Sequence, residues 1–258
     1  PQMFYRQIKH GITILATGAL ANRPGEYLLD EHRAVVTQLD LDGLLEKRPQ
    51  AAKDWNNVVM IQCVGSRVPE NPNCSKICCQ AAVKNALRIR ELNEDAGIFI
   101  LYRDMRTSGF DEDYARKARE QGIIFVPYEL DERPMVQADG DAVTVTFKDP
   151  ILQRSIQIPA ECLALSTGFR ADEESTEDLG SIFKLARTPD GYFLEDHVKL
   201  RPVDLPIPGF FVAGTAHSPK TIRESIAQGQ AVAGRAQTLL ARDVISMGAA
   251  VARVDGAK

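Results

Sequence analysis

Four of the chain's five cysteines lie within seventeen positions, with the spacing Cys63-x10-Cys74-x3-Cys78-Cys79. Four thiolates are the usual ligand set of an iron–sulfur cluster or of a structural zinc ion. Structural zinc sites usually combine two separated Cys-x2–4-Cys pairs, which this spacing does not provide. The pattern therefore favours an iron–sulfur cluster, with zinc or a labile disulfide as the alternatives. Cys162 falls within an apolar run and is expected in the core.

A helix expected over about residues 74–93 would help to position these thiols. It would place Cys74 and Cys78 on one face, because residues four apart lie one above the other. Cys79 lies about 100° further round and can join them only near a helix end. The free N–H groups and the dipole of a helix N-terminus favour thiolates there. Cys63, at the end of the preceding strand, would close the site from the sheet side.

The elements expected around the cysteines alternate between strands and helices, which predicts an α/β layer with right-handed crossovers. Apolar runs predict strands, and 3.6-residue periodicity predicts helices. The expected strands are 11–15, 58–61, 98–102, 123–128, 162–165 and 209–215, and the expected helices are 39–45, 74–93, 111–121 and 221–242. Alternation between 135 and 157 predicts a small antiparallel β element, with strands at 143–147 and 155–158.

A second group of residues follows the ends of three expected strands. Ala16-Thr17-Gly18 and Ser166-Thr167-Gly168 are similar turns, and Gly214 and Thr215 follow the strand near 209. In open α/β sheets, ligands bind beyond the carboxyl ends of the strands. The helix start near Thr221 adds free N–H groups that suit a phosphate or an anionic ring.

Composition limits the class of protein. Hydrophobic residues make up 44% and charged residues 26% of 258 residues, which is typical of a globular protein of one or two domains. A net charge of −4 argues against nucleic acid as a partner. No apolar run approaches the roughly 18 residues of a membrane span, and no signal-peptide pattern opens the chain. Clustered free cysteines indicate a reducing compartment, so a cytoplasmic protein is expected.

The segments IQCVGSR, NCSKICC, LYRDMRT and AGTAHSPKTIRESIAQ resemble the family of heterodisulfide reductase A subunits. This family lies within the thioredoxin reductase-type flavoproteins with two dinucleotide domains, and the resemblance covers nearly the whole chain. It implies a parallel-sheet, Rossmann-like domain of the nicotinamide type inserted into a partial FAD-binding domain. The implied domains are a first FAD-domain part at 1–50, the inserted domain with the cysteines at 51–157, a second FAD-domain half at 158–245 and a tail at 246–258.

The resemblance also implies two cofactors, FAD and a [4Fe–4S] cluster, the latter on Cys63, Cys74, Cys78 and Cys79. The residues that it places near FAD are Ala16, Thr17, Gly18, Lys84, Thr167, Gly168, Gly214, Thr215, Lys220, Thr221 and Ile222. Lys84 and Lys220 would lie near the flavin ring, where a cation stabilises the reduced anion. For each lysine the alternative is a solvated surface residue. His217 could form a hydrogen bond near the ring, or be incidental to it.

The implied function is electron transfer between the flavin and iron–sulfur partners, accompanied in some relatives by flavin-based bifurcation. The implied partners are other iron–sulfur redox subunits of anaerobes, similar to heterodisulfide reductase B and C subunits or linked to a hydrogenase or ferredoxin. The resemblance also allows a homodimer. No residue looks like a general acid, a general base or a nucleophile, so the chain is expected to act as one subunit of an oxidoreductase.

The sequence departs from the wider flavoprotein pattern in three places. It contains no G-x-G-x-x-G, so the chain is expected to begin after the first FAD-binding βαβ unit. A second fingerprint, expected after residue 61, is replaced by Gln62-Cys63-Val64-Gly65-Ser66-Arg67, which argues against NAD(P)H there. Thr215 stands where many relatives carry an aspartate. Arg103, Asp104 and Arg106 follow a strand where wider relatives bind a nicotinamide cofactor, and a local salt-bridge cluster is the alternative.

Two other functions remain open from the sequence. One is a zinc-stabilised α/β scaffold, without enzymatic activity, that docks redox subunits. The other is a thiol–disulfide oxidoreductase that uses Cys78 and Cys79. The second ranks last, because adjacent cysteines form a strained ring and no Cys-x-x-Cys is present.

Overall fold

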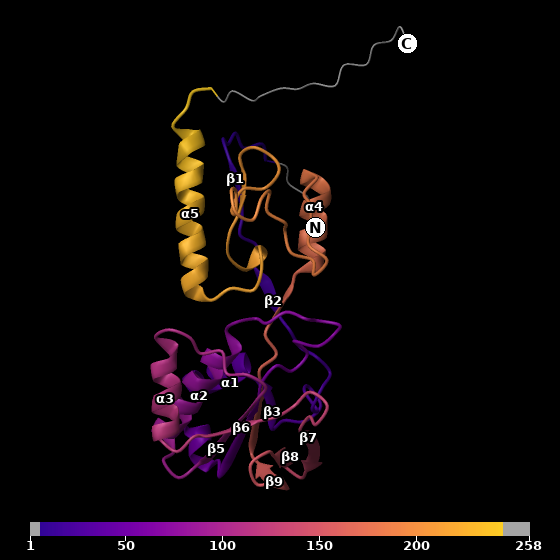
Figure 1. Cartoon of the computed structure of the whole chain (residues 1–258), viewed down its shortest axis with the longest axis vertical. Coiled ribbons are helices and arrows are strands. Elements are labelled where there is room, and N and C mark those ends of the chain that lie inside the picture. The colour runs from indigo at the N-terminus through magenta and orange to yellow at the C-terminus, as the bar shows by residue number, and fades with distance from the viewer. Residues whose placement is uncertain (1–5, 245–258) are drawn as a thin grey trace. The chain divides into compact units, whose positions relative to one another are not determined.

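The computed structural model of the chain describes residues 6–244, which form two compact units. Within the described part, unit 1 contains residues 6–18, 173–218 and 222–244, and unit 2 contains residues 19–172 and 219–221. Figure 1 shows the order of the elements by colour along the chain. The expected tail at 246–258 lies outside the described residues.

Unit 2 is built on a parallel sheet of five strands in the spatial order β3-β10-β4-β5-β6. These strands are β3 (Val35–Thr37), β10 (Cys162–Leu165), β4 (Asn57–Ile61), β5 (Gly97–Tyr102) and β6 (Ile124–Pro127). The unit boundaries fall at 18/19 and 172/173 rather than at the expected 50/51 and 157/158. The reason is that β3 and β10 pair with each other, and β10 also pairs with β4, so both strands join the sheet of the inserted domain.

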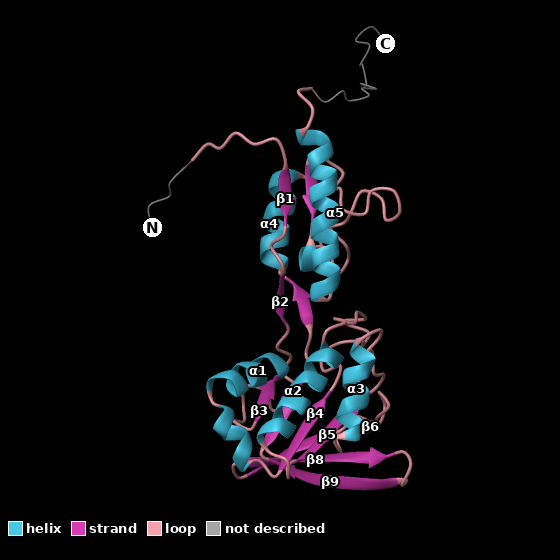
Figure 2. Ribbon diagram, turned by 90° about the vertical axis from the view of Figure 1, so that its left-hand side faces the viewer, coloured by secondary structure: helices cyan, strands magenta, loops and turns pink. Residues whose placement is uncertain are grey.

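The two faces of this sheet are covered by different elements, so unit 2 has three layers. Helices cover one face (Figure 2), namely α1 (Gln38–Lys47), α2 (Cys78–Leu92), α3 (Asp111–Glu120) and the short 3-10 helix η1 (Pro49–Asp54). An antiparallel sheet packs on the other face, made of β7 (Met135–Asp139), β8 (Ala142–Asp149) and β9 (Arg154–Ala160). Side chains alternate along β4, so Met60 packs with the helices and Ile61 with the antiparallel strands.

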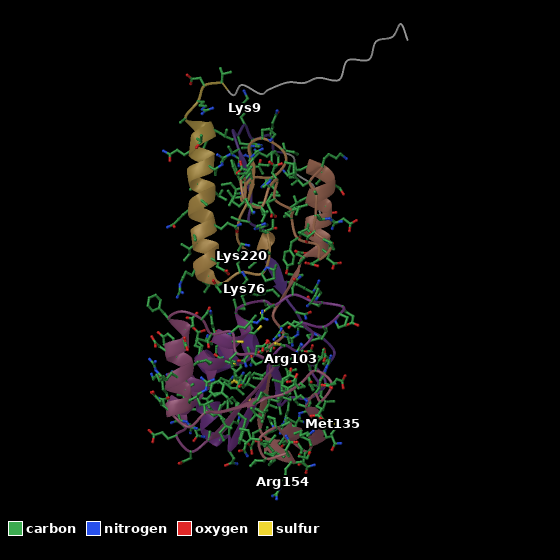
Figure 3. The ribbon with its side chains drawn as sticks, viewed as in Figure 1. Lys9, Lys76, Arg103, Met135, Arg154 and Lys220 are labelled. Atoms are coloured by element: carbon green, nitrogen blue, oxygen red, sulfur yellow. The ribbon has the colours of Figure 1, made fainter. Side chains whose placement is uncertain are left out.

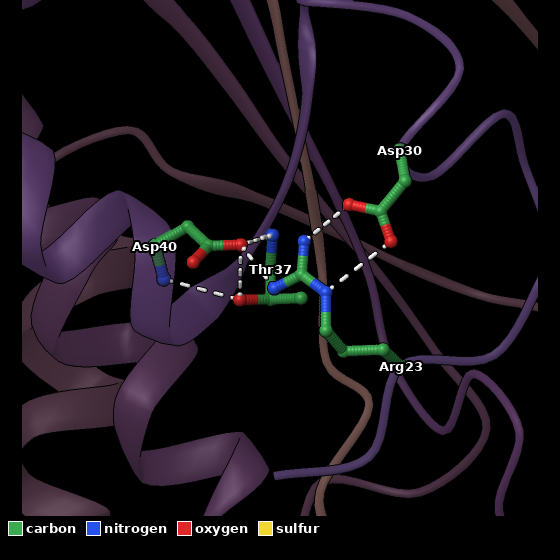
Figure 4. A network of polar contacts seen from close by, with 4 residues as sticks. All are labelled: Arg23, Asp30, Thr37 and Asp40. Carbon is green, nitrogen blue, oxygen red and sulfur yellow. Dashed lines mark hydrogen bonds and ion pairs between the residues drawn. The ribbon is translucent and has the colours of Figure 1, made fainter.

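A capping box fixes the start of α1. The Thr37 hydroxyl accepts a hydrogen bond from Asp40 N at 3.1 Å, and the Asp40 carboxylate accepts one from Thr37 N at 3.2 Å. Arg23 joins this carboxylate to Asp30, with Arg23 Nη1 2.9 Å from Asp40 Oδ2 (Figure 4). The box therefore satisfies two backbone N–H groups at the helix start and ties the preceding loop to it.

The helix that carries the cysteines begins at Cys78, not near Cys74 as the periodicity predicted. Lys76 has a φ of +65°, a left-handed conformation that an α-helix does not contain. Ser75 is held by a hydrogen bond to a distant segment, since its Oγ accepts from Phe169 N at 2.9 Å. Cys74 is therefore a loop residue, and the expected stacking of Cys74 and Cys78 on one helix face is wrong.

Three strands and one helix were not expected from the sequence. The strands are β2 (Ala19–Ala21), β3, and β11 (Phe169–Ala171), which pairs antiparallel with β2; the helix is α4 (Glu173–Phe183). Each of these strands has three residues, which is too short for a periodicity to show.

Unit 1 contains a parallel pair of strands, β1 (Thr13–Leu15) and β12 (Phe210–Val212), in which Leu15 lies opposite Val212. A short 3-10 helix, η2 (Gly214–Ala216), follows β12, and the unit also contains α4 and the long helix α5 (Ile222–Leu240). Its buried core includes Leu15 and Val212. The carboxyl ends of β1 and β12 therefore lie side by side, and each leads directly into a glycine-containing turn.

No helix in the described part of the chain has the length and apolar character of a membrane span.

Candidate functional site

The four clustered cysteines occupy one end of the sheet of unit 2. Cys63 lies two residues after β4 and has a left-handed φ of +60°, Cys74 lies in the following loop, and Cys78 and Cys79 open α2. Figure 3 labels Lys76 in this loop and Arg103 just after β5. Since β4 and β5 are parallel and joined through α2, the start of this helix lies at the carboxyl ends of the strands.

Burial and mutual repulsion both act on the thiols at the start of α2. Burial raises the pKa of the Cys78 thiol to about 12, and the negative charges of Cys79, Cys63 and Cys74 oppose its ionisation further. Burial is also the main cause of the raised pKa of Cys79, on which Cys63 and Cys74 act in the same direction. All four sulfur atoms are therefore close enough to interact, and a metal must displace protons from Cys78 and Cys79.

Three of the sulfur atoms accept hydrogen bonds from nitrogen. Arg67 Nη1 lies 3.6 Å from Cys63 Sγ, and Lys76 N lies 3.4 Å from Cys74 Sγ. The backbone N–H of Arg106 donates to Cys79 Sγ, also at 3.4 Å. Such N–H donors stabilise thiolates, which are the form that ligates a metal.

The basic residues after β5 form a local network with Arg67, as one of the two interpretations of these residues expected. Asp104 Oδ2 lies 2.5 Å from Arg67 Nη2 and 3.9 Å from Arg106 Nη2. Arg103 Nη1 donates to Arg67 O at 2.7 Å. Burial opposes the charge of Arg67, but its hydrogen bonds to Cys63 and Asp104 outweigh this and leave its pKa raised.

The turn at Thr167 and Gly168, expected near the flavin, packs against the cysteine loop. Gly168 has a φ of +72°, and a Cβ atom there would lie 2.0 Å from Ser75 Oγ and 3.5 Å from Cys78 Sγ. Thr167 itself is buried. Only glycine therefore fits at position 168, and this turn forms one wall of the cysteine site.

The other strand-end turns meet in unit 1. Ala16, Thr17 and Gly18 follow β1, while Gly214 and Thr215 follow β12. A Cβ at Gly18 would lie 3.7 Å from Thr215 Oγ1, so the two turns are neighbours. A Cβ at Gly214 would meet no atom within 4 Å, which leaves open space beside its backbone.

The remaining residues expected near the flavin do not gather at one place. Ile222 begins α5 in unit 1, whereas Lys220, Thr221 and Lys84 belong to unit 2. Lys84 Nζ forms an exposed ion pair with Asp42 Oδ1 at 2.6 Å. Its ammonium group is therefore engaged within unit 2, between α2 and α1.

A hydrogen-bonded chain beside the Gly214 turn includes two residues that the sequence reasoning missed, Gln228 and Glu195. Gln228 Oε1 accepts from Gly214 N at 2.8 Å, and Gln228 Nε2 lies 2.8 Å from His217 Nδ1. His217 Nε2 in turn lies 2.8 Å from Glu195 Oε2. No motif marks these residues in the sequence, because Glu195 comes from a segment without a periodic pattern.

Between residues 6 and 244, no three histidine, cysteine or acidic side chains converge on a position that could hold one metal ion. A single zinc ion needs its sulfur ligands at about 2.3 Å from one point. A four-iron cluster takes one thiolate on each of its irons, so its ligands surround a larger volume. The cysteine arrangement fits the larger group better than a single ion.

The fold is that of the thioredoxin reductase-type flavoproteins with two dinucleotide-binding domains. The structure of thioredoxin reductase from T. acidophilum superimposes with a TM-score of 0.60 at 16% sequence identity, covering 88% of this chain and 65% of that chain. No protein-family model matches the sequence.

Curated relatives are A subunits of heterodisulfide reductases, to which the chain is homologous over about nine-tenths of its length. One of two such iron-sulfur subunits of the CoB–CoM heterodisulfide reductase of Methanopyrus kandleri is 35% identical over 246 residues, covering 89% of this chain and 37% of the relative. Its counterpart in the ferredoxin/F420H2-dependent CoB–CoM heterodisulfide reductase of Methanosarcina acetivorans is 34% identical over 250 residues, covering 91% and 31%. The chain thus spans about a third of the length of these relatives.

Proposed function

We propose that the chain is an electron-transfer module of an oxidoreductase, with a [4Fe–4S] cluster on Cys63, Cys74, Cys78 and Cys79. One observation carries the proposal: four mutually interacting thiols lie at the sheet edge and helix start where related folds bind a dinucleotide phosphate. The homology to A subunits of heterodisulfide reductases, one of them named an iron-sulfur subunit, supports it.

The chain's own residues prepare this site for an anionic group. Arg67 and the backbone N–H groups of Lys76 and Arg106 already donate to cysteine sulfur atoms. The start of α2 has no side-chain cap, so its first N–H groups are free to face the site. When bound, the cluster would supply one-electron transfer, and its potential would depend on these hydrogen bonds and charges.

Unit 1 is the proposed location of part of an FAD site. The turns after β1 and β12 bring Gly18 beside Thr215, and the open space beside Gly214 admits a ligand close to the backbone. The thioredoxin reductase-type fold supports FAD as this ligand. The proposed contacts are Ala16, Thr17, Gly18, Gly214, Thr215 and Ile222, while Thr167 and Gly168 are reassigned to the cysteine site. FAD would supply two-electron exchange.

The proposed partners are other iron–sulfur proteins. The net charge of −4 and the lack of a nucleophile or acid–base group among the residues described at either site favour electron exchange over substrate chemistry within this chain. The relatives named above are subunits of larger reductases, one of them ferredoxin-dependent. We therefore propose that a ferredoxin-like protein or another iron–sulfur protein of such a complex exchanges electrons with the cysteine site.

Anaerobic reconstitution tests the proposal. The whole chain is treated with ferrous iron, sulfide and FAD, desalted, and assayed for iron, acid-labile sulfide, zinc and flavin. We expect about four iron and four sulfide per chain and absorbance near roughly 400 nm. Cys78→Ser is expected to lose most of the iron, whereas Cys162→Ser keeps it, because Cys162 is buried in β10 away from the four.

The possible results separate the functions that the sequence left open. A chain that binds stoichiometric zinc and no sulfide would overturn the cluster and favour the scaffold. A chain that reduces disulfides after loss of Cys63 and Cys74, but not after loss of Cys78, would favour the thiol–disulfide mechanism. A cluster-bearing chain without flavin would overturn only the FAD half of the proposal.

A further inference from the structure

Two buried side chains beside the cysteine site lack hydrogen-bond partners. Gln62 is fully buried, and neither its Nε2 nor its Oε1 has a partner among the described residues. Ser166 is 1% exposed, and its Oγ likewise has no partner within the described part of the chain. Burying a polar group without a hydrogen bond is costly, so each of these atoms requires a partner from outside the protein.

Only the side chains are unpaired, because the backbone at both positions is well bonded. Gln62 N donates to Leu101 O at 2.9 Å, and Gln62 O accepts from Tyr128 Oη at 2.6 Å. Ser166 N donates to Ile61 O at 2.9 Å, which extends the ladder between β10 and β4. The two residues are thus held rigidly, one step beyond the last paired residues of neighbouring strands.

Strand alternation places both side chains on the helix-covered face of the sheet. Met60 and Ala164, two residues earlier on each strand, belong to the core formed with α2. Residues two apart on a strand face the same side, so Gln62 and Ser166 face that side too. Because they lie at the carboxyl ends of the strands, they point toward the start of α2.

The start of α2 is itself short of partners. This 15-residue helix has no side-chain cap, and its first two residues are Cys78 and Cys79. Gly168, two residues after Ser166, approaches Cys78 Sγ closely enough that a Cβ there would lie at 3.5 Å. Free helix N–H groups, an amide and a hydroxyl therefore surround the thiols, and this set of donors suits an acceptor that carries negative charge.

A nearby pair shows how another buried amide in this unit is matched. Asn85, further along α2, donates from Nδ2 to Gln38 Oε1 at 2.9 Å and to Gln38 O at 3.0 Å. Gln62 and Ser166 have no such neighbour among the described residues, although both are more deeply buried than Gln38. Their unpaired state therefore calls for an acceptor at the edge of the sheet that faces the cysteines.

We infer that Gln62 and Ser166 are positioning and tuning residues that donate hydrogen bonds to sulfur atoms of the cluster and thereby raise its reduction potential. The inference rests on the proposed function. Gln62 Nε2 and Ser166 Oγ are the donors, and Gln62 Oε1 accepts from an ordered water. Hydrogen bonds to cluster or cysteine sulfur stabilise the more negative reduced state, so they shift the potential upward.

The test compares midpoint potentials of the reconstituted whole chain by redox titration monitored with electron paramagnetic resonance. Gln62→Met keeps the volume without the donor, and Ser166→Ala removes only the hydroxyl and cannot overfill the site. Each variant is expected to retain its iron and sulfide and to show a lower midpoint potential, and the double variant a lower one still. Cys162→Ala, on the same strand and face as Ser166, is the control and should leave the potential unchanged.

The outcomes separate this inference from the function on which it rests. A wild-type chain that takes up no iron and sulfide overturns the proposed function, and this inference with it. Variants that carry a full cluster with the wild-type potential overturn the inference alone, since ordered water then satisfies both side chains. If Gln62→Met does not fold, the potential of Ser166→Ala decides in the same way.

Discussion

The Ser75 hydroxyl accepts a hydrogen bond from the backbone N–H of Phe169, with 2.9 Å between Oγ and N. The bond joins the cysteine loop to the start of β11, 94 residues further along the chain. Ser75 is buried, and it lies directly after Cys74. The position of this cysteine therefore depends on a contact between distant segments rather than on the helix that follows it.

Replacing Gly168 should test how closely these two segments pack. In Gly168→Ala, the left-handed φ costs about 1–2 kcal/mol, and the overlap with Ser75 adds about 1–3 kcal/mol. Gly122→Ala is the matched control, because Gly122 also has a positive φ (+77°) but a Cβ there would meet nothing within 4 Å. Urea unfolding followed by the fluorescence of Trp55, the only tryptophan and a residue of unit 2, measures both. Equal costs for the two variants would contradict the tight packing.

Arg67 should raise the potential of a bound cluster, because it combines a positive charge with a hydrogen bond to Cys63 Sγ. We expect Arg67→Met to lower the midpoint potential of the reconstituted chain. Arg106→Met is the comparison, since it removes a half-exposed charge but keeps the backbone N–H that donates to Cys79 Sγ. A shift as large for Arg106→Met as for Arg67→Met would show that charge alone acts, without the hydrogen bond.

Gln228 should protect the turn that follows β12. In Gln228→Leu, Gly214 N and His217 Nδ1 both lose the partner that the structure gives them. An unpaired buried group costs about 1–3 kcal/mol, so the Gly214 amide should exchange with solvent at least roughly tenfold faster. Hydrogen exchange of this amide is the measurement, with Gln230→Leu, on an exposed position of the same helix, as the control. Unchanged protection in Gln228→Leu would argue against the hydrogen-bonded chain.

The capping box of α1 should make the stability of unit 2 depend on acid. Burial opposes ionisation of Asp40, but hydrogen bonds from Thr37 and Arg23 outweigh it and hold its pKa below the usual 3.8. A carboxyl group with a lowered folded-state pKa contributes stability that is present above its unfolded pKa and is lost as the pH falls through its folded pKa. Asp40→Asn should therefore be less stable than wild type at pH 7, by about 1 kcal/mol.

This difference should shrink as the pH falls from about 4 toward 3 and below, since wild-type Asp40 then becomes protonated. Urea unfolding followed by Trp55 fluorescence at several pH values measures it. Asp42→Asn, which removes only an exposed ion pair with Lys84, is the control and should change stability by less than about 1 kcal/mol at any pH. A constant difference between wild type and Asp40→Asn across this range would show that the carboxylate charge is not the cause.

The sequence allowed the central strands and most helices of the fold to be predicted, because these elements are long or strongly apolar. The strand at 58–61 and the helix at 111–121 each matched to within about one residue. The start of α2 was misplaced because the contact of Ser75 with Phe169 and the left-handed Lys76 leave no trace in the periodicity. Short strands such as β2 and β11 depend on their partners, which a single sequence does not show.

The candidate site was predictable in its ligand types but not in its surroundings. The spacing of the four cysteines pointed to the site, and the structure brings the four thiols into mutual interaction. The unpaired state of Gln62 and Ser166 could not be predicted, because it depends on the register of β4 against β10. The expected flavin contacts divide between two units, since the turn at Gly168 packs against the cysteine loop.

The loop between β4 and α2 has little regular structure of its own. Within it, Val68 and Asn71 form a single pair of backbone hydrogen bonds, and the Asn71 side chain donates to Gly65 O at 2.9 Å. On the proposed assignment, the cluster joins the two ends of this loop through Cys63 and Cys74. Iron supply would then set how long the chain survives in the cell, because a loop released from its cluster is an easy target for proteases.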